Sequence, residues 1–350
     1  MRAFDYSFLK SMSVDMDLLN TVSKVEVLRE RDRTRIKAFP TTYSGMEFAA
    51  RMQSVFGSNA IEGIFTSDDR LKGLCTRKVE PKGHNEAEIA GYRDALDLIH
   101  REHGSMRMDP DTIRQLHRIV LSYTGEDGGE WKDADNFIGH RSDDGTIVVH
   151  FETIPAEDTP DAMEQMFLAY RMARQDSGIS RLLLIPCFIL DFLSIHPFLD
   201  GNGRVSRLLT LLMLYKEGYD IGRYVSLESM IYRSRPDYYD SLSRSSENWH
   251  EGHNDYMPFI RYFLGTLFLC YKELDRRFAV AVGSKDNKTS RIEYSVLNSL
   301  FPISKRELHE NLPDISEPMI SAVLGRLLKE GKIEKVGSGP ATRYVRKDDD

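Results

Sequence analysis

The residues from His196 to Arg207 bring together side chains that can move protons and bind phosphate, and they read His-Pro-Phe-Leu-Asp-Gly-Asn-Gly-Arg-Val-Ser-Arg. Histidine has an unperturbed pKa of roughly 6.5, so His196 can accept a proton from a hydroxyl near neutral pH. Arg204 and Arg207 are three residues apart. They can therefore lie on one face of a helix and bind neighbouring phosphate groups through charge-assisted hydrogen bonds.

The glycines between the histidine and the arginines favour a backbone site for anions. Glycine permits positive φ and close approach of a ligand, and amides at the start of the next helix attract negative charge. Asp200 adds a hard oxygen suited to Mg²⁺ carried on those phosphates. A histidine at a helix end is usually a structural residue, and this glycine pattern is usually only a turn. The prediction of a phosphate site therefore rests on the combination, which comprises Asp200, Gly201, Asn202, Gly203, Arg204 and Arg207.

Helices must position this segment. Residues 181–195 are apolar nearly all round, which is typical of a helix buried inside a bundle. Pro197 ends that helix, residues 197–203 form a loop, and a helix over 204–216 is closed by Gly218.

Periodicity of about 3.6 residues predicts a mainly α chain, with further helices over 13–38, 44–62, 85–103, 109–122 and 256–278. Pro40 separates the first two of these helices, and Asp109 caps the fourth. Residues 136–155 differ, because a turn at 143–145 precedes a run of β-branched and aromatic residues. This pattern predicts a β-hairpin.

The C-terminal segment follows a polar linker over 283–290, and its predicted elements are helices over 291–300, 304–311 and 316–331 and strands over 332–336 and 342–345. Three helices followed by a hairpin are typical of a small α+β winged-helix domain. Residues 286–347 hold 11 Lys and Arg against 8 Asp and Glu. Arg326 and Lys329 make no dense basic face on the third helix, so DNA and protein both remain open as partners.

The formal charge of −7 argues against a chain that coats nucleic acid or binds an acidic membrane. The longest apolar runs are too short to span a bilayer, and the N-terminus has no signal-peptide pattern. Cys75, Cys187 and Cys270 are far apart, which argues against a zinc site or a disulfide framework. We expect a soluble, cytoplasmic protein without a membrane partner.

The string at 196–207 resembles, residue for residue, the signature HPFx(D/N)GNGRxxR of the Fic (filamentation induced by cAMP) family, and the similarity extends from about residue 40 to 278. The resemblance implies a helical bundle with a β-hairpin flap. It also implies ATP bound with its phosphates on the glycine loop, Mg²⁺ held at Asp200, and a hydroxyl deprotonated by His196 that attacks the α-phosphorus. The implied divisions are an N-terminal helical region over 1–110, a catalytic core over 111–280 and the winged helix over 286–347.

The resemblance also implies that the hairpin docks the target protein by strand addition, with Val148, Val149 and His150 beside the modified residue. Residues 152–155 lack the Pro-Pro pair common in the family, which leaves the register of the flap open. Tyr238 and Tyr239 match the region that lines adenine in the family, although aromatic residues at this spacing also suit a core.

Ser58, Glu62 and Gly63 fit the family's inhibitory pattern (S/T)xxxE(G/N) at the end of a helix over about 44–63. A Glu62 carboxylate paired with Arg207 would remove a partner of the γ-phosphate and put negative charge in its place. The same carboxylate could orient a water against an AMP-modified target. A helix that ends in Glu-Gly is also commonly just a capped helix.

These observations predict a protein adenylyltransferase that moves AMP from ATP to Ser, Thr or Tyr hydroxyls of a target protein, with the chain itself among the candidate targets. Two alternatives remain open, a DNA-binding regulator whose Fic domain senses nucleotide and a hydrolase that removes AMP. UMP transfer also remains open, since no sequence pattern shows which nucleotide base the protein recognises. No recognised pattern in the sequence identifies the target protein or the signal that releases Glu62. The oligomeric state is open as well, with a homodimer as one option.

Overall fold

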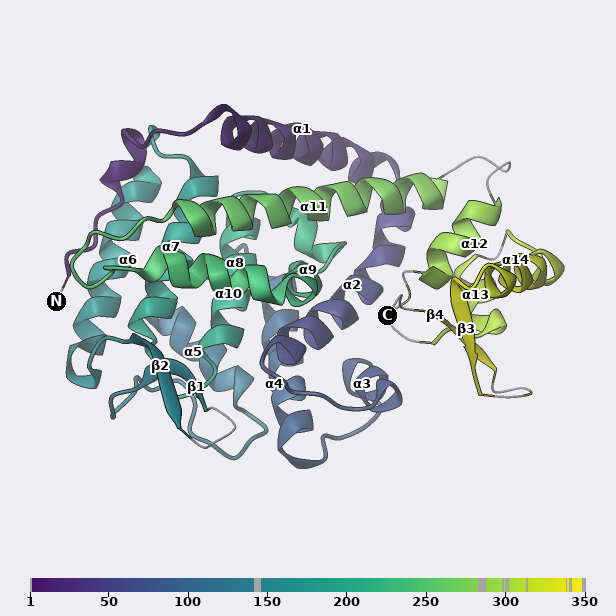
Figure 1. Ribbon diagram of the computed structural model, residues 1–350, viewed down its shortest axis with the longest axis horizontal. Coiled ribbons are helices and arrows are strands. Elements are labelled where there is room, and N and C mark those ends of the chain that lie inside the picture. Colours follow the sequence, from purple (N-terminus) through teal and green to yellow (C-terminus); the bar gives the residue numbers. More distant parts are fainter. Residues whose placement is uncertain are drawn as a thin grey trace. The chain divides into compact units, whose positions relative to one another are not determined.

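Figure 1 shows the computed structural model, which describes residues 2–141, 146–282, 288–297, 299, 302–312, 314–337, 339 and 342–347. The predicted turn at 143–145 and residues 283–287 of the predicted linker lie outside the described residues. Contacts divide the chain into two compact units, Met1–Ala38 with Ser44–Lys272 and Phe39–Tyr43 with Glu273–Asp350. The domain limits expected at 110, 280 and 286 stay predictions.

Helices make up most of the first unit, which confirms the mainly α prediction. They are α1 (Met16–Ala38), α2 (Pro40–Ile61), α3 (Asp68–Cys75), α4 (Gly83–Glu102), α5 (Pro110–Val120), α6 (Thr159–Gln175), α7 (Arg181–Ile195), α8 (Asn202–Lys216), α9 (Leu227–Arg233), α10 (Arg235–Ser246) and α11 (Met257–Val282). The short 3₁₀ helices are η1 (Ser7–Lys10), η2 (Ala156–Asp158) and η3 (Asp220–Arg223).

The central helix is α7, which packs beside α6 and α8 (Figure 1). Every residue from Leu182 to Ile195 is buried, as the apolar sequence predicts. Its one acidic residue, Asp191, accepts hydrogen bonds from Tyr6 Oη at 2.8 Å, Trp249 Nε1 at 2.7 Å and Tyr256 Oη at 2.8 Å. A buried carboxylate is tolerated when its oxygens are hydrogen-bonded, so Asp191 ties the N-terminal segment and the loop before α11 to the bundle centre.

Several predicted helix boundaries were wrong by a few residues, and two of them are instructive. The second helix begins at Pro40 rather than 44, because proline lacks only an N–H that has no acceptor in a first helical turn. The predicted loop over 197–203 is shorter, since α8 already begins at Asn202. The capping by Asp109 is as predicted, with Oδ1 accepting from Thr112 N–H at 2.9 Å. Sequence patterns did not identify α3, α6, α9 or α10.

The predicted hairpin is present as β1 (Phe137–Arg141) and β2 (Ile147–Glu152), paired antiparallel with a bulge between Ile138 and Gly139. Residue 136, next to β1, bonds to the α7–α8 loop, and residue 153, next to β2, bonds to residue 136.

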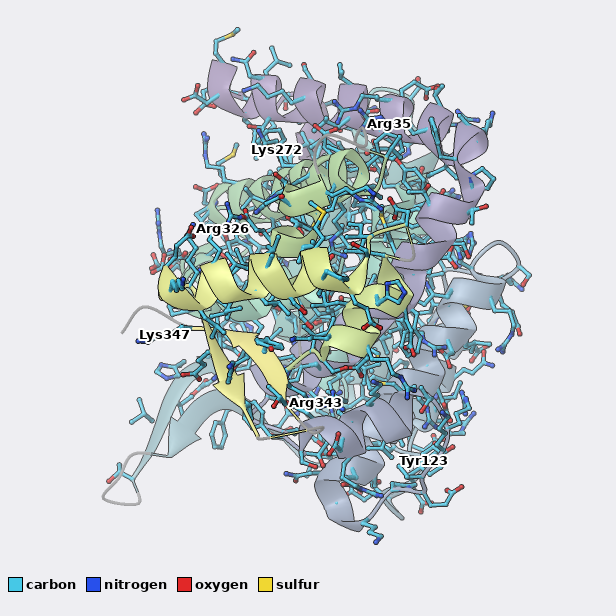
Figure 2. The ribbon with its side chains drawn as sticks, turned by 90° about the vertical axis from the view of Figure 1, so that its right-hand side faces the viewer. Arg35, Tyr123, Lys272, Arg326, Arg343 and Lys347 are labelled. Atoms are coloured by element: carbon cyan, nitrogen blue, oxygen red, sulfur yellow. The ribbon has the colours of Figure 1, made fainter. Side chains whose placement is uncertain are left out.

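The second unit has its own apolar core beneath α12 (Lys288–Leu297), α13 (Lys305–Asn311), α14 (Glu317–Lys329) and the antiparallel strands β3 (Ile333–Val336) and β4 (Arg343–Arg346). The element order is the predicted one, and its assignment as a winged helix stays a prediction. Figure 2 labels Arg326 on α14 and Arg343 on β4. Arg326 pairs with Glu293, and Arg343 Nη1 lies 3.1 Å from Glu307 Oε2.

No helix in the described part of the chain is both long enough and apolar enough to cross a membrane.

Candidate active site

His196 lies at the end of α7 in the left-handed conformation, with φ of 52° and ψ of 62°. Its Nδ1 is 3.1 Å from the Leu193 carbonyl oxygen. A carbonyl only accepts hydrogen bonds, so Nδ1 carries the ring proton. Burial lowers the pKa of His196 to about 4, and the nearby Lys132 charge acts in the same direction. The imidazole is therefore neutral at neutral pH, with an unprotonated Nε2.

Asn202 closes the loop between α7 and α8. The Phe198 N–H donates to Asn202 Oδ1 at 3.0 Å, and Asn202 Nδ2 donates to the Phe198 carbonyl at 2.6 Å. Gly201 precedes it as the N-cap of α8, with φ of 76°, the positive value predicted for a loop glycine. Gly203 lies within the first helical turn. The N–H groups at the start of α8 have no intrahelical acceptor, as at any helix N-terminus, and the anion site expected there stays a prediction.

His117, from α5, supports the same loop from beneath. Its ring stacks on Phe198 with centroids 3.7 Å apart. The Gly129 N–H donates to Nδ1 at 2.8 Å, so Nε2 carries the proton and donates to the Asp200 carbonyl at 3.1 Å. Burial lowers the pKa of His117 to about 4. Sequence reasoning missed this residue.

A buried lysine joins the loop to the hairpin. Lys132 Nζ donates to Asn136 Oδ1 at 2.7 Å, Thr153 Oγ1 at 2.8 Å and the Ile195 carbonyl at 3.2 Å. Asn136 Nδ2 donates onward to the Phe198 carbonyl at 2.8 Å. Asn136 directly precedes β1 and Thr153 directly follows β2. The base of the hairpin and the α7–α8 loop therefore share one hydrogen-bond network, in which burial lowers the pKa of Lys132 to about 8.

Arg204 is held between two carboxylates. Its Nη1 is 2.9 Å from Glu88 Oε1 on α4, and its Nη2 is 2.8 Å from Asp200 Oδ2. Arg204 and Glu88 are buried, whereas the Asp200 side chain is 63% exposed. Glu88 was not predicted, because nothing in the sequence indicates which buried acid reaches this arginine.

Arg207 is buried and bound by the end of α2. Its Nε donates to Ser58 Oγ at 2.8 Å, and its Nη2 donates to the Ser58 carbonyl at 2.9 Å and to Glu62 Oε1 at 2.8 Å. Gly63, with φ of 79°, ends the helix directly after Glu62. Two of the three residues of the sequence pattern, Ser58 and Glu62, therefore contact Arg207, and the inhibitory role of the pattern stays a prediction.

The Glu62 carboxylate also contacts the start of α8. A Cβ added to Gly203 would lie 2.3 Å from Glu62 Oε1, so only glycine leaves room for the carboxylate there. The end of α2 is itself fixed against α9, because a Cβ on Gly57 would lie 2.7 Å from the backbone nitrogen of Ser229. The negative charge of the Glu62 carboxylate thus lies close to the N-terminal amides of α8.

The two predicted adenine residues differ in environment. Tyr238 is 4% exposed and packs against Phe259 and Tyr262, which is the surroundings of a core residue. Tyr239 is 41% exposed. The charges of Arg207 and Glu62 contribute to the pKa of both phenols. Their role toward adenine stays a prediction, and Tyr239 is the one with an accessible ring.

The predicted docking residues lie on β2. Val149 is 48% exposed, His150 is exposed and Val148 is half-buried. The Glu152 carbonyl accepts from His250 Nε2 at 2.7 Å, which fixes the end of the strand. The docking role of these residues stays a prediction.

The acidic groups suit a metal that arrives on a substrate. Among the described residues, no group of three or more His, Cys, Asp or Glu side chains could hold a metal ion. Asp200 instead offers a single, largely exposed carboxylate beside the anion site. Mg²⁺ is typically bound by one or two carboxylates together with substrate phosphates, so Asp200 fits this arrangement.

Residues 107–214, which include the α7–α8 loop and both arginines, match the family model described as Fic/DOC. This segment is therefore similar to Fic domains. Fic proteins with known structures share the fold, since a Fic family protein from Desulfovibrio desulfuricans G20 aligns over 97% of this chain and 98% of its own, with a TM-score of 0.62 and 18% identity.

Curated relatives of the Fic domain carry the name protein adenylyltransferase Fic. The relative from Nematostella vectensis is 25% identical over 68% of this chain and 53% of its own length. The relative from Culex quinquefasciatus is 28% identical over 62% of this chain and 40% of its own length. The chain thus spans about half, or less, of the length of these relatives.

The lowered pKa of His117 predicts that acid destabilises the first unit. Between pH 7 and 5 the unfolded histidine, with its pKa near 6.5, takes up a proton that the folded one, with a pKa of about 4, does not. Unfolding therefore binds protons, and acidification lowers the free energy of unfolding by about 2 kcal/mol through this group. His117→Gln should lose that part of the pH dependence.

The measurement is urea unfolding at both pH values followed by tryptophan fluorescence, because Trp131 and Trp249 both lie in the first unit. His253→Gln, at an exposed position, is the control. An equal pH effect in His117→Gln and the wild-type chain would contradict the prediction.

Proposed function

We propose that the Fic domain transfers AMP from ATP to a hydroxyl of a protein target. The observation that carries the proposal is the state of His196. Its Nδ1 is engaged by the Leu193 carbonyl, and none of the residues that the structure describes bonds to Nε2. A neutral imidazole with a fixed tautomer, placed one loop away from an anion site, is suited to a general base.

The reaction begins when the target hydroxyl gives its proton to His196 Nε2. The hydroxyl oxygen forms a bond to the α-phosphorus, and the bond from that phosphorus to the pyrophosphate oxygen breaks. AMP then resides on the target and pyrophosphate leaves with the electron pair. A pKa of about 4 makes the resting imidazole a weak base, but the charges of bound triphosphate favour its protonated form and raise that pKa.

The phosphates bind at the start of α8, where free N–H groups, Arg204 and Arg207 supply positive charge. Catalysis of this kind depends on position and charge stabilisation more than on covalent help from the protein. Asp200 would hold Mg²⁺, which supplies further neutralisation of phosphate charge when bound. The hairpin residues Val148, Val149 and His150 would pair with the target backbone and bring its hydroxyl to His196.

The relatives support this activity at the level of their shared name, protein adenylyltransferase. Substrate identity is not implied by that name, and the chain itself is one candidate target. The DNA-binding alternative has weaker support, since Arg326 and Arg343 are paired with glutamates within the second unit.

The restraint is part of the proposal. Arg207 is the second arginine of the phosphate site, and the Glu62 carboxylate 2.8 Å away takes the place that a γ-phosphate oxygen would occupy. ATP bound in this state lacks its Arg207 contact, so the α-phosphorus is poorly aligned with His196. Glu62 is 32% exposed, which also gives it access to water and favours AMP hydrolysis as a second activity.

We expect His196→Ala to lower the rate of AMP transfer by roughly 10²–10⁴, as loss of a general base does. The affinity for ATP should stay within about threefold of wild type, because the imidazole acts on the target hydroxyl. Transfer is measured with labelled ATP and affinity by calorimetry, with His253→Ala as the control. Transfer at the wild-type rate would remove His196 from the mechanism.

We expect Glu62→Gly to raise AMP transfer by about 10- to 100-fold, the effect of restoring one charge-assisted contact to phosphate. An ordinary helix-end glutamate would give no gain, and a catalytic acid would give a loss. The gain should vanish in the double variant Glu62→Gly with Arg207→Ala, because the two residues act through one contact. Equal or lower self-modification by correctly folded Glu62→Gly would defeat the restraint.

A further inference from the structure

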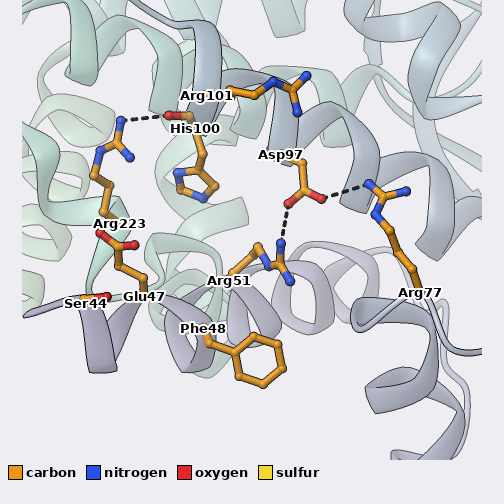
Figure 3. Close-up of a pocket in the computed structure, with 9 residues that line it drawn as sticks. All are labelled: Ser44, Glu47, Phe48, Arg51, Arg77, Asp97, His100, Arg101 and Arg223. Carbon is orange, nitrogen blue, oxygen red and sulfur yellow. Dashed lines mark hydrogen bonds and ion pairs between the residues drawn. The ribbon is translucent and has the colours of Figure 1, made fainter. Parts of the chain in front are cut away.

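A second cavity lies in the first unit and shares no residue with the α7–α8 loop (Figure 3). Its volume is about 540 Å³. The walls come from the first half of α2, the C-terminal half of α4, η3 and the segment after α3. Nothing in the transfer mechanism uses these residues.

Arginines dominate the walls. The lining residues include four arginines, Arg51, Arg77, Arg101 and Arg223, and two carboxylates, Glu47 and Asp97. Such an excess of positive charge in a concave site focuses an attractive potential for anions.

Two of these arginines are fixed in place. Asp97 bridges them, with Oδ1 3.0 Å from Arg51 Nη1 and Oδ2 3.0 Å from Arg77 Nη2. Arg51 Nη2 also donates to the Cys75 carbonyl at 3.1 Å. Asp94 Oδ1 also lies 2.6 Å from Arg77 Nη2, so two carboxylates balance these two guanidinium groups and hold them in the wall.

The other two arginines keep donors available. Arg223 Nη2 donates to the His100 carbonyl at 2.8 Å, and its guanidinium lies over the Tyr215 ring at 5.3 Å. Within the described part of the chain, no carboxylate lies within 4.0 Å of Arg223. The Arg101 side chain is 65% exposed and contacts only its neighbour Glu102, through Nε at 3.0 Å. A guanidinium has five N–H groups, so Arg101 and Arg223 each keep N–H donors available for the oxygens of an anion.

His100 lines the same cavity, and the charges of nearby arginines affect its pKa. Its ring lies between Arg223 and Arg51 in Figure 3. Burial lowers the pKa of His100 to about 3, and the charges of Arg223 and Arg51 add to the effect. Burial disfavours a charge of either sign, so only the contribution from Arg223 and Arg51 favours an anion here.

We propose that this cavity binds a small molecule bearing more than one phosphate group. A single phosphate could not contact guanidinium groups on several walls of a cavity of about 540 Å³, whereas linked phosphates can. Arginine favours this chemistry because its planar fork matches phosphate oxygens in pairs. Pyrophosphate is the simplest member of the class, and a nucleoside diphosphate or triphosphate is the larger one.

An anion bound in this cavity would stabilise the packing of α2 against α4 and η3. Arg51 belongs to α2, whereas Arg101 and Arg223 belong to the body of the first unit, so one anion bonds to both sides. A ligand stabilises the arrangement that binds it. The helix ends at Ile61, ten positions after Arg51 and about 15 Å away at the rise of an α-helix, and Glu62 follows directly. The bound anion thus helps to fix the helix that precedes Glu62.

The test uses the full chain with Arg207→Ala, which weakens the phosphate site of the Fic motif. Pyrophosphate, inorganic phosphate and adenosine are titrated by calorimetry at matched ionic strength. We expect pyrophosphate to bind more tightly than phosphate, and adenosine neither to bind nor to compete. Adding Arg223→Gln should weaken pyrophosphate binding at least about tenfold, the effect of losing a charge-assisted contact. Adding Arg33→Gln, on an exposed arginine of α1, should leave it unchanged.

Arg101→Gln serves as a second cavity variant, because its exposed side chain supports no buried contact. Thermal unfolding confirms that each variant folds. The proposal is overturned if pyrophosphate does not bind the Arg207→Ala chain, if both cavity variants bind it as tightly as the parent, or if adenosine displaces it. No step of the test measures AMP transfer, so its outcome is separate from that of the proposed function.

Discussion

The contact between Arg207 and the end of α2 is the interaction on which the site depends. A buried guanidinium needs hydrogen-bond acceptors and negative charge, and here Ser58 and Glu62 supply both. Arg207 is therefore paired without any ligand in the site. Under the proposed function, the requirement that makes Arg207 a ligand for phosphate also makes it a ligand for Glu62, and the stable resting state would then also be the restrained one.

The rest of the site is a scaffold for one loop. Asn202 closes the loop from within, His117 holds the Asp200 carbonyl, and Lys132 holds the carbonyl of Ile195. Each of these side chains is buried and bonds to a backbone carbonyl of the loop or of the end of α7, which fixes the position of His196 and the start of α8. Lys132 also bonds to residues at both ends of the hairpin. Displacement of the hairpin would therefore disturb the hydrogen bonds that position the α7–α8 loop.

Sequence patterns predicted the local features well because those depend on neighbours in the chain. The limits of α7 follow from an apolar run, the Asp109 cap from its position before Pro110, and the positive φ of Gly201 from its residue type. The partners of buried polar groups could not be predicted in this way. Glu88, His117 and Lys132 come from elements far from the motif in sequence, and only tertiary packing decides which loop or arginine each one reaches.

The central claim is that Glu62 occupies the place of the γ-phosphate on Arg207, and nucleotide affinities test it most directly. The dissociation constants of ATP and ADP are compared by calorimetry in chains carrying His196→Ala, with Glu62 either present or replaced by glycine. With Glu62 present, the γ-phosphate gains no Arg207 contact, so we expect ATP and ADP to bind about equally. With glycine, we expect ATP to bind about tenfold more tightly than ADP. The same ATP-to-ADP ratio in both chains would contradict the claim.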